Sequence, residues 1–217
     1  MLVRMTDSPE HGQARQFAAL DLGSNSFHMV VAQESENGLL TVVDRIKQSV
    51  RLAAGLDEDG CLSDDAEERA LACLKVFGER IRDLPSNQVR AVGTNTLRKA
   101  KDVLGFLERA REALGHRVDV ISGREEARLI YRGVVRDVES PGCLLVMDIG
   151  GGSTELIIGE GAEPTQLDSL YMGCVSWTKR YFPDGTITGS GMDEAILAAR
   201  QELQSVVRAY RKAGWQQ

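Results

Sequence analysis

The same short turn occurs twice in this sequence, each time between two apolar segments. Asp21-Leu-Gly-Ser-Asn-Ser26 follows the apolar residues 17–20, and Asp148-Ile-Gly-Gly-Gly-Ser153 follows residues 143–147, so the two turns lie 127 residues apart, at positions 21 and 148. A single glycine-rich turn is typical of an ordinary hairpin. Two copies that share the Asp, the aliphatic residue, the Gly and the Ser in the same context indicate a duplicated lobe.

The pattern around the first turn predicts an α/β lobe. Strands are expected at 17–20, 27–32, 40–52, 89–92 and 118–121, and helices at 63–84, from the turn at 93–96 to 114, and at 122–138. The pattern then restarts, with strands at 143–147, 155–159 and 165–172 and helices at 175–181 and 192–213. The expected domains are a mobile tail at 1–15, a first lobe at 16–127 and a second lobe at 128–217. The second lobe lacks the later strands of the first, so the chain is expected to be a piece of a longer protein.

Composition excludes several classes of function. The formal net charge of −6 argues against general nucleic-acid binding, which usually leaves a basic footprint. A polyanionic ligand would therefore have to be captured by local geometry. No apolar run is long enough to span a bilayer. The cysteines have no metal-finger spacing and predict reduced, buried thiols of a cytoplasmic protein: Cys61, Cys73, Cys143 and Cys174.

Both turns have the composition of an anion-binding loop. Glycine lets successive backbone N–H groups point toward one anion, and hydroxyl and amide side chains add further donors. The phosphate-binding residues expected from the two turns are Gly23, Ser24, Asn25, Ser26, Gly150, Gly151, Gly152 and Ser153, with Thr154 as a further candidate.

Carboxylates flank both loops. Asp148 and Glu155 are a reasonable ligand set for Mg²⁺, which takes few carboxylates together with water and phosphate oxygens. Asp21 is a further candidate in the first loop. Either aspartate, taken alone, is more typical of a side chain that stabilises a turn. The duplication favours a metal-binding or catalytic role for the two aspartates.

The helix that starts at Ser122 contains a candidate general base. Ser122 and Glu125 form a capping box, which gives Glu125 a structural role. Glu126 lies on the same helical stripe as Ile130 and Val134, and so is expected to point into the core or a cleft. Desolvation there would raise its pKa toward the range of a general base. The alternative is an exposed glutamate that favours the helix dipole.

Arginines give a second signal. Arg98 follows the turn at 93–96, at the expected start of a helix, where a cation opposes the dipole, so we expect it to be there for a ligand and to clamp phosphate oxygens. Four more arginines recur along the helix that follows Ser122 and either track a polyanion or form a solvated face: Arg124, Arg128, Arg132 and Arg136.

Longer motifs resemble the exopolyphosphatase/guanosine pentaphosphate phosphatase family. The residues that carry the resemblance are Phe17-Ala-Ala-Leu-Asp-Leu-Gly-Ser-Asn-Ser-Phe-His-Met29, Val92-Gly-Thr-Asn-Thr-Leu-Arg98, Ile121-Ser-Gly-Arg-Glu-Glu-Ala-Arg-Leu129, Asp148-Ile-Gly-Gly-Gly-Ser-Thr-Glu155 and Met172-Gly-Cys-Val-Ser176. The resemblance implies the actin-like, sugar-kinase and Hsp70-ATPase α/β fold, with duplicated ribonuclease-H-like lobes, mixed sheets and a truncated second lobe. It further implies that Glu126 activates water, that Arg98 and the two loops hold phosphate, and that Asp148 and Glu155 lie near Mg²⁺.

The expected function is hydrolysis of the terminal phosphoanhydride bonds of inorganic polyphosphate. The triple glycine at 150–152 favours this substrate modestly over guanosine pentaphosphate. The alternatives are a guanosine pentaphosphate 5′-phosphohydrolase of the stringent response and a non-catalytic phosphate or nucleotide sensor on the same fold. A sugar kinase fits less well. The resemblance implies that the full-length protein is a homodimer in the cytoplasm. Peripheral contact with the membrane stays an open alternative.

Overall fold

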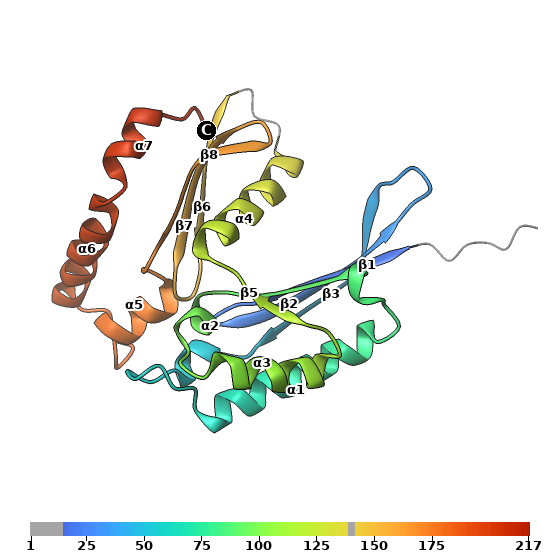
Figure 1. Cartoon of the computed structure of the whole chain (residues 1–217). Coiled ribbons are helices and arrows are strands. Elements are labelled where there is room, and N and C mark those ends of the chain that lie inside the picture. Colours follow the sequence, from blue (N-terminus) through green and yellow to red (C-terminus); the bar gives the residue numbers. More distant parts are fainter. Residues whose placement is uncertain (1–14, 139–141) are drawn as a thin grey trace, which may run out of the picture.

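The computed structural model describes residues 15–138 and 142–217, which form two α/β lobes (Figure 1). The expected mobile tail lies outside the described residues except for Arg15. The first lobe contains a five-stranded sheet in the order β3-β2-β1-β4-β5. β1 pairs antiparallel with β2 and parallel with β4, so the sheet is mixed. Its strands are β1 (Gln16–Leu22), β2 (Ser26–Glu34), β3 (Leu40–Ser49), β4 (Val89–Gly93) and β5 (Val118–Val120). This is the ribonuclease-H-like arrangement of the actin-like fold.

Two helices cover one face of this sheet, α1 (Asp64–Ile81) and α3 (Val103–Leu114) (Figure 1). Ser63 begins α1 by accepting a hydrogen bond from the amide of Ala66. Alternate residues of β1 and β2 point into the core under these helices, so Leu20, Leu22 and Phe27 are buried. The residues between them, Asp21 among these, lie on the opposite face, which is turned toward the second lobe.

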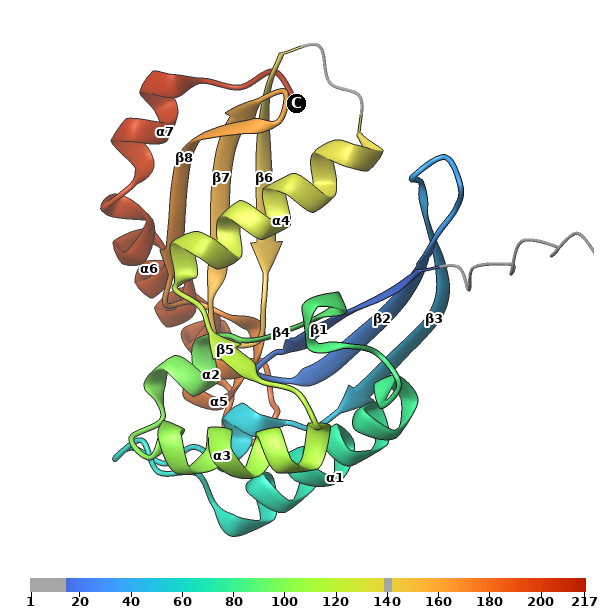
Figure 2. The ribbon, with the colours of Figure 1, turned by 45° about the vertical axis from the view of Figure 1, so that its right-hand side comes forward.

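The second lobe repeats the antiparallel half of the first. Its sheet has the order β6-β7-β8 and consists of β6 (Cys143–Ile149), β7 (Thr154–Glu160) and β8 (Glu163–Leu170). α4 (Gly123–Asp137) crosses one face, while α6 (Gly189–Gln204) and α7 (Val207–Ala213) lie on the other (Figure 2). Short helix α5 (Cys174–Tyr181) connects β8 to α6. The three strands correspond in order to β1, β2 and β3, which confirms the duplication.

Helix α4 joins the lobes. It begins one turn after β5 and packs on the second sheet, where Tyr131 is fully buried and its hydroxyl donates to the carbonyl of Gly161 at 3.0 Å. The ring lies directly over Gly159, where a Cβ would overlap it. The lobe boundary expected between residues 127 and 128 falls inside this continuous helix.

Strand β6 is less covered than its counterpart β1. Met147 and Ile149 are 54% and 63% exposed, whereas Leu20 and Leu22, at the matching positions, are buried under α1 and α3. At the start of β6, Cys143 accepts a hydrogen bond from the amide of Gln216, on the edge where β1 pairs with β4. Within the described ranges the second sheet therefore has three strands and an open apolar flank.

Several expected elements differ in extent. The helix expected to continue to residue 114 is two helices, α2 (Asn95–Lys99) and α3, because the intervening Lys101 donates its amide to the carbonyl of Gly60. The helix expected at 192–213 is broken between α6 and α7. The strand expected at 40–52 ends at Ser49 and a 3₁₀ turn follows, η1 (Leu52–Gly55). Of the four thiols predicted to be buried, only Cys73 is buried, Cys143 is half-buried, and the prediction is wrong for Cys61 and Cys174, which are exposed. No helix in 15–138 or 142–217 is long and apolar enough to cross a membrane.

The docking of α4 gives a stability test. Gly159→Ala should lower the free energy of unfolding by roughly 1–3 kcal/mol, because the new methyl group overlaps the Tyr131 ring. Gly133→Ala on α4, where nothing lies within 4 Å, is the matched control and should raise stability by about 0.5–1 kcal/mol. Urea unfolding of both variants measures the difference. Equal midpoints would contradict the packing described here.

Candidate active site

The two repeated loops touch each other at the junction of the lobes. A Cβ on Gly151 would lie 3.3 Å from the Cβ of Ser24 and 3.5 Å from that of Asn25. A Cβ on Gly152 would overlap the side-chain amide of Asn95. Gly152 thus allows a close approach that a side chain would block, and Gly151 leaves little more than van der Waals clearance to the first loop. The turns at Asp21 and Asp148 lie on the same side of the molecule, as the duplication predicts.

The loops enclose a polar cavity of about 360 Å³. Every residue expected in the two loops lines it, together with Asp21, Asp148 and Glu126. The full set of lining residues is Asp21, Gly23, Ser24, Asn25, Ser26, His28, Lys47, Thr94, Glu126, Asp148, Ile149, Gly150, Gly151, Gly152, Ser153 and Cys174. Three expected site residues, Arg98, Thr154 and Glu155, do not line the cavity and lie behind it.

The first loop is held from outside by the segment after β3. The carbonyl of Asn25 accepts hydrogen bonds from the amides of Val50 and Arg51, and the carbonyl of Ser24 accepts one from Ala53. Arg51 adopts a left-handed φ of 53°, alone among the described non-glycine residues. The Ser24 hydroxyl, itself buried, accepts from Thr96 at 2.8 Å. These bonds fix the carbonyl oxygens of the loop and leave its N–H groups available to an anion.

The second loop is held by the start of α5. Cys174 donates its amide to the carbonyl of Gly150 at 2.9 Å, and Val175 donates to Gly151 at 2.9 Å. A Cβ on Gly173 would overlap the amide nitrogen of Gly152, so the Gly173 backbone lies directly against the loop. This contact gives a structural reason for the Met172-Gly-Cys-Val-Ser176 motif. Thr154 is locked as well, because its hydroxyl donates to the carbonyl of Met172 at 2.5 Å.

Glu126 points into the junction of the lobes from the first turn of α4. Ser122 caps the helix by accepting from the amide of Glu125, whose carboxylate pairs with Arg128 and does not reach back to the cap. The carboxylate of Glu126 accepts a hydrogen bond from Arg98 Nη1 at 2.7 Å, and its side chain is 16% exposed. Burial raises the pKa of Glu126, Arg98 lowers it, and the charges of Asp21 and Asp148 raise it, so that the net direction is upward.

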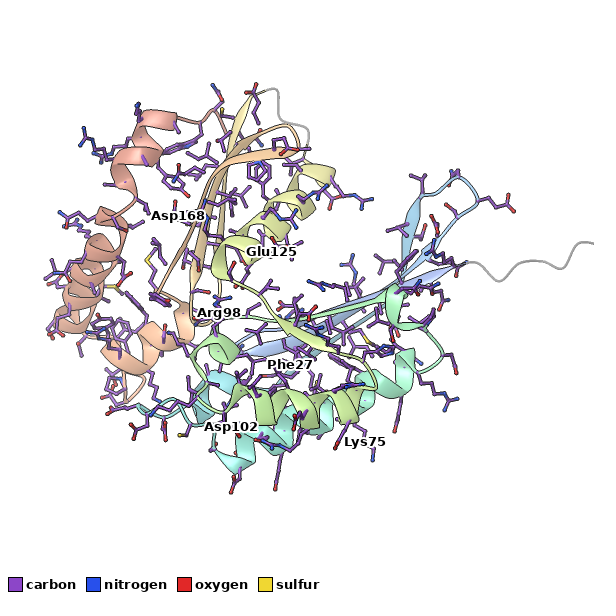
Figure 3. All side chains as sticks on the ribbon, in the orientation of Figure 1. Phe27, Lys75, Arg98, Asp102, Glu125 and Asp168 are labelled. Atoms are coloured by element: carbon purple, nitrogen blue, oxygen red, sulfur yellow. The ribbon has the colours of Figure 1, made fainter. Side chains whose placement is uncertain are left out.

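Arg98 lies where the lobes meet (Figure 3). It belongs to the last turn of α2, where a cation suits the helix dipole, so the argument that placed it at a helix start is wrong. Both side-chain hydrogen bonds of Arg98 come from Nη1, one to Glu126 and one to the carbonyl of Ile121 at 3.0 Å. Its structural partner is therefore the candidate base.

The site has an excess of negative charge. Asp148 and Glu155 are cross-strand neighbours on β6 and β7. Burial, followed by the charges of Asp148 and Glu155, raises the pKa of Asp21 to about 6. Glu155 is 1% exposed and accepts from the Ser169 hydroxyl at 2.8 Å. Its pKa rises to about 7, chiefly through burial and then through the charge of Glu126.

This repulsion fits a bound cation. Asp21 and Asp148 line the cavity and could hold Mg²⁺ directly, while Glu155 lies behind them. No cluster of three or more metal-ligating side chains occurs in the described part of the chain. Mg²⁺ does not require one, since it is commonly held by one or two carboxylates together with water and substrate phosphate oxygens.

Sequence reasoning missed several lining residues. His28 lies opposite Asp21 on the neighbouring strand, and Lys47 lies opposite His28. Lys47 places an ammonium group at the cavity, and burial followed by the charge of Lys47 lowers the pKa of His28. Only the strand register brings these three together.

Asn95 is buried and its Oδ1 has no hydrogen-bond partner among the described residues.

The fold is that of a two-lobed protein of the actin-like class, in which two glycine-rich loops face each other across a polar cavity. Residues 30–217 match the model of the Ppx/GppA phosphatase family. The chain belongs to the Ppx/GppA phosphatase family.

Individual relatives agree with this assignment. The chain is 50% identical over 199 residues to the guanosine-5′-triphosphate,3′-diphosphate pyrophosphatase of Vibrio cholerae serotype O1, covering 92% of this chain and 40% of that protein. An exopolyphosphatase from Cytophaga hutchinsonii superposes with a TM-score of 0.83 at 26% identity, over 94% of this chain and 65% of that one. An exopolyphosphatase-like protein gives 0.80 at 30% identity, over 90% and 62%. The chain thus spans less than half the length of the Vibrio relative.

The raised pKa of Glu155 predicts a pH-dependent stability. An unfolded glutamate ionises near its ordinary value of 4.5, whereas folded Glu155 ionises at about 7, so between these values the folded state holds the extra proton. Its contribution to stability is therefore full below pH 4.5 and is lost as the pH rises through 7. Glu155→Gln should reduce this fall in urea unfolding measured at pH 5 and pH 8. An unchanged pH dependence would mean that Glu155 ionises normally.

Proposed function

We propose that the complete protein containing this chain is a hydrolase that removes the 5′-terminal phosphate of guanosine pentaphosphate. The observation that carries this proposal is the convergence of both anion-binding loops and Glu126 on one cavity. The relative named for guanosine-5′-triphosphate,3′-diphosphate shares half of the aligned residues over nearly the whole chain, and so favours this nucleotide over polyphosphate.

In this proposal, backbone amides of the loops and cationic side chains both bind the substrate phosphate. The amides of the Gly23–Ser26 loop and of Gly151–Ser153 receive the terminal phosphate, since the amide of Gly150 is already donated to the carbonyl of Ser153, and Lys47 adds a positive charge at the cavity. Arg98 does not line the cavity, and Nη1 is bonded to Glu126 and to the Ile121 carbonyl, so its direct contact with phosphate requires the side chain to rearrange when substrate binds. Phosphoryl transfer depends mainly on such positioning and charge stabilisation.

Glu126 is the general base in this proposal. It accepts a proton from water as the water oxygen attacks the terminal phosphorus. The bond between that phosphorus and its bridging oxygen breaks, and the products are orthophosphate and guanosine tetraphosphate. Arg98 holds the Glu126 carboxylate in place through its 2.7 Å hydrogen bond. Mg²⁺ held by Asp148 and Asp21, with Glu155 behind them, would neutralise phosphate charge.

Inorganic polyphosphate is the second candidate substrate. Two solved structures described as an exopolyphosphatase and as exopolyphosphatase-like superpose well on this chain, and the triple glycine at 150–152 is compatible with that activity. Both reactions break a terminal phosphoanhydride bond and need the same cavity. The nucleotide reading implies a cytoplasmic enzyme of the stringent response. A homodimer of the complete protein remains part of the proposal.

Substrate preference is measured by parallel assays. The complete protein, supplied with Mg²⁺, should release phosphate from guanosine pentaphosphate with a higher kcat/KM than from polyphosphate, because its relative is named for the nucleotide. The reverse order would replace the first candidate with the second. Tight binding of both without turnover would indicate a sensor.

Glu126→Gln tests the base. The variant should lose about 10²- to 10⁴-fold in kcat, because the amide cannot take the proton, while substrate affinity changes little. Glu125→Gln is the matched control, since Glu125 pairs with Arg128 and does not line the cavity. Equal losses in the two variants, or none in Glu126→Gln, would remove Glu126 from the reaction.

A further inference from the structure

A second polar cavity lies at the opposite ends of the parallel strands. The catalytic cavity adjoins Thr94, which follows β4, whereas this one adjoins the first residues of β4 and the residues at the start of β5. Its volume is about 490 Å³, and the two cavities share no lining residue. Its charged or titratable lining residues are Arg90, Arg111, His116, Arg117 and Asp119.

Three arginines face a single carboxylate there. Asp119 accepts from Arg117 Nε at 2.7 Å and also pairs with Arg90. It therefore holds two guanidinium groups at the same wall of the cavity. Among the described residues no carboxylate lies within ion-pair distance of Arg111, which belongs to the last turn of α3. The cavity thus has a local excess of positive charge in a chain whose net charge is −6.

The opposing charges do not cancel this excess. The carboxyl end of α3, which closes at Gly115, places partial negative charge nearby, and Arg111 lies in that same turn and offsets it. Glu112 lines a neighbouring cavity that shares Ser86, Gly115 and His116 with this one. Arginine guanidinium groups match phosphate oxygens in geometry as well as in charge.

His116 forms a buried part of the wall of this cavity. Its side chain is 8% exposed, and its Nδ1 has no hydrogen-bond partner in the part of the chain that the structure describes. Buried polar atoms are nearly always satisfied by protein, water or a ligand. Nδ1 is closed off from solvent in this arrangement, so an anion in the cavity contacts the guanidinium groups and not this atom.

We propose that this cavity is a second anion-binding site, separate from the catalytic one, that takes a small phosphate-bearing anion between Arg111, Arg117 and Arg90. Two or more linked phosphate groups fit it better than one, because the arginines come from three different segments: β4, the end of α3 and the turn before β5. The proposal does not depend on the substrate of the catalytic cavity.

Pyrophosphate titration of the whole chain, followed by amide chemical shifts in solution, tests the proposal. The amides of Gly115 and Arg117 should shift saturably, and more tightly with pyrophosphate than with orthophosphate at equal ionic strength. In Arg111→Gln/Arg117→Gln the dissociation constant reported by these amides should rise at least about tenfold, because two charge-assisted contacts are lost.

Arg208→Gln/Arg211→Gln, which makes the same change of charge on exposed positions of α7, is the matched control and should leave that constant unchanged. The amides of Gly23 and Gly151 report the catalytic cavity separately in every sample. Shifts there without any at Gly115 and Arg117 would overturn this proposal and leave the proposed function intact. An equal loss of affinity in both double variants would also overturn it, since the effect would then be one of net charge alone.

Discussion

The close approach of the two glycine-rich loops is the contact on which the site depends. Gly151 lies against Ser24 and Asn25, and Gly152 lies against Asn95. A side chain at Gly152 would overlap Asn95, and one at Gly151 would crowd Ser24, at the point where the two loops face each other. The bonds that fix each loop come from elsewhere in its own lobe: from the segment after β3 for the first and from the start of α5 for the second. The lobes therefore meet through two preformed loops.

The negative charge around the two loops favours a ligand that includes a cation. Asp21, Asp148 and Glu126 line the cavity, and Glu155 lies beside Asp148 on the neighbouring strand. Burial together with mutual repulsion raises the pKa of Asp21 to about 6 and that of Glu155 to about 7. Arg98 offsets part of this charge at Glu126. A phosphate chain would add further negative charge, so the arrangement makes chemical sense with a divalent cation. Asp21 and Asp148, which repel each other, would then both bind the metal.

The positions of the two loops and of Glu126 could be predicted from the sequence, because a duplicated lobe repeats its geometry. Two turns with the same residues at the same place in two related lobes must lie in equivalent positions, and a helical stripe through Glu126, Ile130 and Val134 fixes the direction of the carboxylate. Features that depend on distant contacts could not be predicted. The break between α2 and α3 follows from a bond between Lys101 and Gly60. The presence of His28 and Lys47 at the cavity follows from strand register, including a register shift opposite Val31 and Ala32, where Val43 of β3 has no partner. The pairing of Arg98 with Glu126 likewise appears only in three dimensions.

The central claim is that one phosphate group is held by both loops at once. The most direct measurement is a crystal structure of the complete protein with Glu126 replaced by Gln and guanosine pentaphosphate bound. The account predicts that the terminal phosphate contacts backbone amides of both the Gly23–Ser26 and the Gly150–Ser153 segments, with residue 126 beside it. A terminal phosphate that touches only one loop, or that lies outside the cavity between them, would contradict the account.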